Sequence, residues 1–152
     1  MSNRLNYFEQ TPKAMGILLE QESYLHQSFN EGVINQELWD LVKLRVSQIN
    51  QCAFCIDMHH TEATKRGETV QRLYGLSAWK DMPFYTSIER LALEWAEHLT
   101  SGQSVSDALY DRVVSGLGED GIVNLTIAIN AINSWNRISK VFKPELGAYV
   151  AE

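Results

Sequence analysis

The stretch that decides the fold is residues 41–59, LVKLRVSQINQCAFCIDMH. Its first half continues an apolar pattern with the three- and four-residue spacing of one helical face, at Leu38, Leu41, Val42, Val46 and Ile49. Asn35 is a suitable N-cap for this helix. Only Asn50 and Gln51 separate it from the cysteines, which leaves room for a tight turn. We therefore expect a second helix to begin near Cys52 and to pack antiparallel to the first.

Helix signals continue on both sides of this stretch, whereas strand-like alternation is absent. Proline follows Thr11, Thr86–Glu89 reads as a capping box, and Ser106 is a further cap. The expected helices cover residues 12–29, 35–49, 52–67, 69–74, 86–99, 106 to 116 or 118, and 119–139. No linker or low-complexity segment divides the chain. The sequence therefore predicts an all-α, bundle-like fold in a single domain, residues 1–152.

The last of these helices is apolar on more than one face, between Ile122 and Ile132. A helix of this kind is stable only when it is buried on nearly all sides. Burial against another subunit and burial in the core of a monomer both meet that requirement.

Composition narrows the classes of partner. The net charge of −6 disfavours nucleic acid and anionic membranes, because both need a basic surface. The apolar run near Ile122 contains polar residues and is too short to span a bilayer. The first six residues lack the apolar segment of a signal peptide, and both cysteines fall in one CxxC motif, so we expect a cytoplasmic protein.

The residues that point to chemistry are Cys52, Cys55 and His59. At separations of three and four, all three share one face of a helix. Cys52 would lie at the helix start, where free N–H groups favour a thiolate, and His59 would stack one turn from Cys55 as its base. Two thiols and a base are the components of a redox centre.

Asp40 is the acid that the hairpin geometry favours as a partner of His59. With a rise of roughly 1.5 Å per residue, both lie about 10–13 Å from the turn on adjacent helices. A carboxylate in reach of His59, directly or through a water, would fix its tautomer and raise its basicity. Glu37 lies a further turn away.

Zinc is the main alternative use of these residues, with His60 or Asp57 as a fourth ligand. Every candidate ligand lies within nine residues on one helix, which does not readily surround a metal, so we expect no metal site. His60 points about 100° away from His59 and is expected at the surface. His26 and His98 have no partner in the sequence and are expected to be structural.

The stretch from Leu41 to His59 resembles the AhpD-like alkylhydroperoxidases of the carboxymuconolactone decarboxylase superfamily. The resemblance extends over about residues 12–144 and includes Glu62-Ala63, Leu73-Tyr74, Trp79, residues 89–93 and residues 133–137. The pattern acid-x11-Cys-x2-Cys-x3-His carries most of its specificity. This chain differs from the family in having Asp40 where glutamate is usual, Ala53-Phe54 between the cysteines where some members have histidine, and Gln51 where glycine is frequent.

The resemblance implies an all-helical trimer or hexamer with peroxidase activity. It implies that peroxide oxidises Cys55, that Cys52 then closes a disulfide, and that His59 with an upstream acid, here Asp40, relays the proton. It also implies re-reduction by a dithiol, in some members on a lipoyl-bearing partner, without a bound cofactor. We therefore expect an antioxidant thiol peroxidase acting on organic hydroperoxides.

Two other functions remain as alternatives. The first is a non-catalytic redox sensor whose CxxC controls assembly. The second is decarboxylation of a cyclic acid, although members with that activity generally lack the CxxC.

Overall fold

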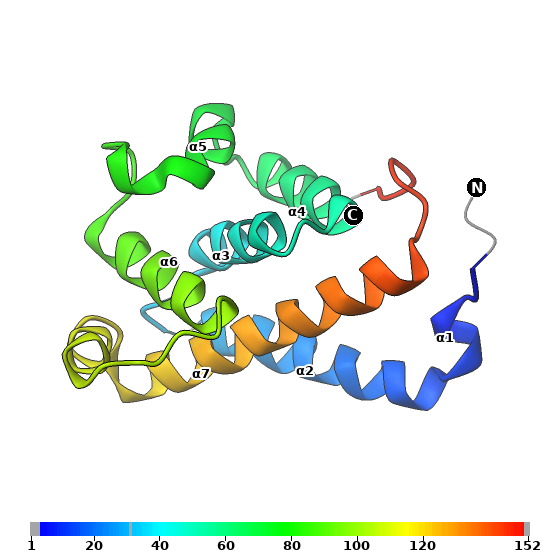
Figure 1. Cartoon of the computed structure of the whole chain (residues 1–152), viewed down its shortest axis with the longest axis horizontal. Coiled ribbons are helices and arrows are strands. Elements are labelled where there is room, and N and C mark those ends of the chain that lie inside the picture. The colour runs from blue at the N-terminus through cyan, green and yellow to red at the C-terminus, as the bar shows by residue number, and fades with distance from the viewer. Residues whose placement is uncertain (1–3, 31, 151–152) are drawn as a thin grey trace.

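The structure is a computed structural model that describes residues 4–30 and 32–150 (Figure 1). Its α helices are α1 (Tyr7–Gln10), α2 (Pro12–Asn30), α3 (Gln36–Ile49), α4 (Ala53–Lys65), α5 (Val70–Gly75), α6 (Ser87–Thr100) and α7 (Asp107–Phe142), with a 3-10 helix, η1 (Leu76–Asp81), after α5. The described residues form no strand, which confirms the all-α prediction.

Helix α3 is the centre of the packing. It contacts α2, α4, α6, α7 and η1, and most of its residues are buried. One hydrophobic cluster unites α3 with α2, α6 and α7 around Trp39 and Leu125, and a second unites it with α4, α5, η1 and α6 around Leu41 and Leu93. Because α3 and α6 contribute to both clusters, the described residues pack as one domain.

The predicted caps are present at the helix starts. The side-chain oxygens of Asn35, Thr86 and Ser106 accept hydrogen bonds from the first-turn N–H groups of α3, α6 and α7. At Thr86 the reciprocal bond from the backbone N–H to Glu89 completes a capping box. Helix α2 begins at Pro12, as predicted. These local signals determine the helix boundaries because they satisfy N–H groups that the helix itself leaves unpaired.

Helix α7 is interrupted at Gly118, where the sequence predicts the end of one helix and the start of another. The backbone there has φ 76° and ψ 169°, in a region that favours glycine. Beyond this break Leu125, Ile129 and Ile132 are buried against the rest of the chain, whereas Val123 is 57% exposed. The chain's own core therefore accounts for most of the helix's apolar surface.

Among residues 4–30 and 32–150, no helix is both long enough and apolar enough to cross a membrane.

Candidate active site

The turn between α3 and α4 sets the position of the cysteines. Gln51 has a left-handed backbone with φ 54°, a conformation that glycine adopts more easily. Cys52 is the N-cap of α4, as predicted, and its sulfur accepts a hydrogen bond from the Cys55 N–H at 3.4 Å. The turn therefore delivers both sulfurs to the first turn of α4.

Side chains of α7 hold this turn. The Asn50 amide donates to the side-chain oxygens of Asn133 and Asn136, both at 2.9 Å, and Lys140 donates to the Asn50 carbonyl oxygen at 2.8 Å. Asn136 is fully buried and also donates to the Ser47 hydroxyl. Bonds from a packed helix leave the turn little freedom, so the cysteines have a well-defined place in the fold.

Cys52 and Cys55 form a disulfide with their Cα atoms 5.3 Å apart. Each is only 1% exposed. They differ in their surroundings, because Cys55 lines a partly open cavity of about 410 Å³ and Cys52 is not part of its lining. A substrate in this cavity would therefore meet Cys55 rather than Cys52.

The cavity is largely apolar, with a polar group of side chains from three helices, α2, α3 and α4. Its apolar and aromatic lining comes from Tyr7, Phe8, Leu19, Phe54, Met58, Ile132, Trp135 and Tyr149. Apart from Cys55, Tyr7 and Tyr149, the titratable side chains that line the cavity are those of Glu22, His26, Lys43, His59 and Glu62. An apolar molecule with a small polar head would match these walls.

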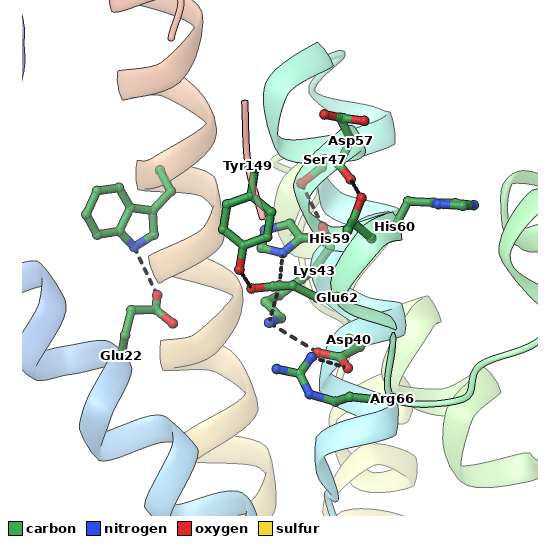
Figure 2. A network of polar contacts seen from close by, with 12 residues as sticks. Glu22, Asp40, Lys43, Ser47, Asp57, His59, His60, Glu62, Arg66 and Tyr149 are labelled. Atoms are coloured by element: carbon green, nitrogen blue, oxygen red, sulfur yellow. Dashed lines mark hydrogen bonds and ion pairs between the residues drawn. The ribbon is translucent and has the colours of Figure 1, made fainter. Parts of the chain in front are cut away.

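His59 lies one turn beyond Cys55 and lines the same cavity. Its Nδ1 lies 2.9 Å from Oε2 of Glu62 (Figure 2), while its buried Nε2 has no hydrogen-bond partner. Burial lowers the pKa of His59 despite the opposing effect of Glu62, so the imidazole is neutral at pH 7. With the proton on Nδ1 facing a carboxylate, Nε2 carries a free lone pair and is able to accept a proton.

Glu62 is the acid that contacts His59, which corrects the expectation for Asp40. Burial by itself raises the pKa of Glu62, but bonds from His59 and Tyr149 and the charge of Lys43 outweigh it and hold that pKa well below its usual range. Oε1 of Glu62 accepts from the Tyr149 hydroxyl at 2.7 Å. Glu62 is therefore ionised and has both oxygens engaged.

Asp40 reaches His59 only through intermediates. Its carboxylate pairs with Arg66 at 2.7 Å and with Lys43 at 3.2 Å (Figure 2). Nζ of Lys43 in turn lies 3.4 Å from Oε2 of Glu62. The hairpin argument placed Asp40 in the right neighbourhood, but Glu62 lies on the same helix as His59 and takes the direct position. Asp40 holds Lys43 in place instead.

Glu22 is a second carboxylate in the cavity wall. It accepts a hydrogen bond from Nε1 of Trp135 at 3.0 Å, and burial raises its pKa against the opposing charge of Lys43. His26, expected to be structural, bonds to Gln36 at 2.9 Å and also lines the cavity. His60 is exposed, as predicted.

The structure thus brings three of the four predicted site residues, Cys52, Cys55 and His59, onto the cap and first two turns of α4. Sequence reasoning missed Glu62 and Tyr149. The i, i+3 spacing from His59 could have identified Glu62. No local signal could have identified Tyr149, which lies 87 residues from Glu62 in the chain.

Residues 21–98 match the model of the carboxymuconolactone decarboxylase family, a span that contains the whole cysteine helix. The protein YdfG of Bacillus subtilis (strain 168) is 48% identical over 141 residues, which are 91% of this chain and 93% of YdfG. The chain belongs to the carboxymuconolactone decarboxylase family. Its fold places it among the AhpD-like members.

Two solved structures show this likeness. ATU0492 from Agrobacterium tumefaciens, provisionally assigned to antioxidant defence as AhpD, is 33% identical with a TM-score of 0.87, and the match covers 96% of this chain and 99% of that one. A peroxidase-related protein from Ralstonia eutropha JMP134, described as an alkylhydroperoxidase AhpD core, has a TM-score of 0.81 at 12% identity, covering 93% and 74% of the two chains. The second likeness concerns the fold alone. At the level of the family, the first of these relationships connects the chain with antioxidant chemistry.

Proposed function

We propose that this protein is a thiol peroxidase that reduces organic hydroperoxides, with Cys55 as the sulfur that attacks. The observation that carries the proposal is the asymmetry of the CxxC motif. Cys55 lines the cavity together with His59, whose buried Nε2 has no hydrogen-bond partner, whereas Cys52 caps the helix and is not part of the lining.

In the reduced enzyme, His59 takes the proton of the Cys55 thiol on Nε2. The resulting thiolate attacks one oxygen of the hydroperoxide O–O bond, which breaks, and the alkoxide leaving group takes the proton from His59 and departs as an alcohol. Cys55 is then a sulfenic acid. The Cys52 thiol attacks this sulfur, which forms the disulfide and releases water.

Glu62 supports both proton transfers. Its carboxylate accepts a hydrogen bond from the Nδ1–H group of His59 and stabilises the imidazolium that exists while a second proton resides on Nε2. Because Glu62 is ionised and bonded at both oxygens, it is oriented before the reaction begins.

The cavity walls favour an alkyl or aryl hydroperoxide over a sugar or nucleotide. Phe54 and Met58 flank Cys55 on α4, and Ile132 and Trp135 come from α7. Such walls bind apolar groups by removing their surface from water, and they offer few partners to a highly polar substrate.

A complete cycle also needs two electrons and two protons to reopen the disulfide. A dithiol supplies both by thiol–disulfide exchange. We propose a dithiol reductant, either a small molecule or a lipoyl group on a partner protein.

Substitution of each cysteine tests the proposal. Cumene hydroperoxide consumption is measured with dihydrolipoamide as the reductant, for the wild type, Cys55→Ser and Cys52→Ser. We expect Cys55→Ser to lose turnover entirely, and Cys52→Ser to stop at a sulfenic acid that dimedone traps. Unchanged turnover in Cys55→Ser would refute the role of Cys55. A single oxidation of the wild type without further cycles would favour the redox sensor instead.

A further inference from the structure

The segment that follows α7, residues 143–150, turns back onto α4 (Figure 1). Lys143 ends α7 in a left-handed conformation with φ 49°, which reverses the chain direction. Two bonds then attach the segment to α4. The Gly147 N–H donates to Oδ2 of Asp57 at 3.2 Å, and the Tyr149 hydroxyl donates to Oε1 of Glu62 at 2.7 Å.

Glu62 divides its oxygens between different partners. Oε2 faces His59 at 2.9 Å and Lys43 at 3.4 Å, and Oε1 faces Tyr149 (Figure 2). The bond from Tyr149 therefore opposes any rotation of the carboxylate that would take Oε2 away from Nδ1 of His59. It also lowers the pKa of Glu62.

We propose that Tyr149 is a positioning residue of the thiol site, which fixes the Glu62 carboxylate so that His59 keeps its basic Nε2 directed into the cavity. The expected effect of Tyr149 on peroxidase turnover rests on the proposed function. The effect of Tyr149 on the Cys55 thiol is independent of any peroxide.

The role of the segment follows from this contact. Tyr149 lines the cavity as well as bonding to Glu62, so residues 143–150 supply part of the cavity wall and part of the proton relay at once. The site is complete only when this segment lies on α4. Tyr149 therefore contributes both to the wall of the cavity and, through Glu62, to the basicity of His59.

We expect Tyr149→Phe to weaken His59 as a base without abolishing its basicity. Without the hydroxyl, the Glu62 carboxylate has Lys43 as a competing partner, and the His59 imidazolium that accompanies the Cys55 thiolate is less well stabilised. Loss of one hydrogen bond to a charged group, transmitted through Glu62, should slow Cys55 at neutral pH about three- to tenfold. The apparent pKa of the Cys55 thiol should rise.

The measurement is the pH dependence of Cys55 alkylation by iodoacetamide in the reduced Cys52→Ser protein, with and without Tyr149→Phe. The titratable groups that share the cavity with Cys55 are Tyr7, Glu22, His26, Lys43, His59, Glu62 and Tyr149, and only the last changes. The matched control is Tyr24→Phe, which removes a tyrosine hydrogen bond of 2.8 Å to Asn124 on another face. Superimposable profiles for the Tyr149→Phe and parent proteins would overturn the proposal.

A double-mutant cycle shows whether Tyr149 acts through Glu62. In a Glu62→Ala background, Tyr149→Phe should change the alkylation rate by less than about twofold, because the shared intermediary is absent. An undiminished effect there would also overturn the proposal. Because alkylation needs no hydroperoxide, a wild type without peroxidase turnover would refute the proposed function while leaving this result interpretable.

Discussion

Two ionic clusters in this protein look alike in composition but differ in what they leave unsatisfied. The site cluster consists of Asp40, Lys43, His59, Glu62 and Arg66 on α3 and α4. The Arg72 cluster consists of Glu68, Arg72 and Glu89, which join α5 to α6 and to the turn before α5. Both combine carboxylates and cations with limited exposure to solvent.

In the Arg72 cluster the donors of Arg72 are directed at acceptors. The guanidinium donates to Glu68 at 3.0 Å, to Glu89 at 2.5 Å and to the Phe84 carbonyl oxygen, and the bonds that it donates to Glu89 raise the pKa of Arg72. Arg72 is not part of the lining of the cysteine cavity. Such a cluster stabilises the junction of helices and has no reactive group to offer.

The site cluster, by contrast, ends in a buried nitrogen without a partner, Nε2 of His59. Leaving a buried polar atom unpaired has a free-energy cost that folded proteins usually avoid. His59 lines the cavity together with Cys55, and this shared position gives that cost a chemical purpose. The difference teaches that an unsatisfied atom on a residue of the cavity wall, more than the number of charges, distinguishes the site cluster from the Arg72 cluster.

The largest expected effect is that of His59→Asn. Removal of the base should slow oxidation of Cys55 by cumene hydroperoxide by about 10²–10⁴-fold, the usual contribution of general acid–base catalysis. Stopped-flow measurement on the reduced protein gives the rate constant. The thermal unfolding midpoint should not fall markedly, because the lost nitrogen had no partner. A rate constant close to that of the wild type would remove the distinction between the two clusters.

An intermediate effect is expected when the two candidate acids are compared. Glu62→Gln loses the charged acceptor of His59 and should slow Cys55 oxidation by roughly 10–100-fold. Asp40→Asn removes a charge that acts on His59 through Lys43 and at a distance, and it should slow the oxidation by less than about tenfold. The same stopped-flow assay ranks them. The reverse order would restore Asp40 as the principal acid.

The smallest effect on chemistry is expected for Arg72→Met, which should leave the rate of Cys55 oxidation unchanged. Instead, it should reduce the free energy of unfolding by about 1–3 kcal/mol, because two carboxylates lose their partner at a partly exposed site. Thermal unfolding at pH 7 measures the loss. A slower Cys55 without a change in stability would contradict the structural role.

This stability difference should also depend on pH. Burial raises the pKa of Glu89, but hydrogen bonds from Arg72 and Thr86 outweigh it, so the net pKa lies below the ordinary value of 4.5. A carboxylate with a lowered pKa contributes stability above its unfolded pKa and loses it as the pH falls through the folded value. The gap between the wild type and Arg72→Met should therefore narrow below about pH 4.5. A gap of constant size down to pH 2 would show that Glu89 is not the titrating partner.

The sequence by itself determined the helix boundaries and the place of the CxxC motif at the start of a helix. Asn35, Thr86 and Ser106 cap helices where predicted, and Gly118 interrupts α7 where two helices were expected. Cys52 lies at the start of α4. These features depend on neighbours within a few residues, since capping and helical spacing are local interactions.

Only the tertiary structure decided which partners complete the site. Packing of α3 against α4 paired Asp40 with Arg66, and the return of residues 143–150 placed Tyr149 on Glu62. The cavity that distinguishes Cys55 from Cys52 has walls from α1, α2 and α7, which are distant in the chain. The physical reason is that contacts between distant segments depend on how whole helices pack, and no local spacing records that arrangement.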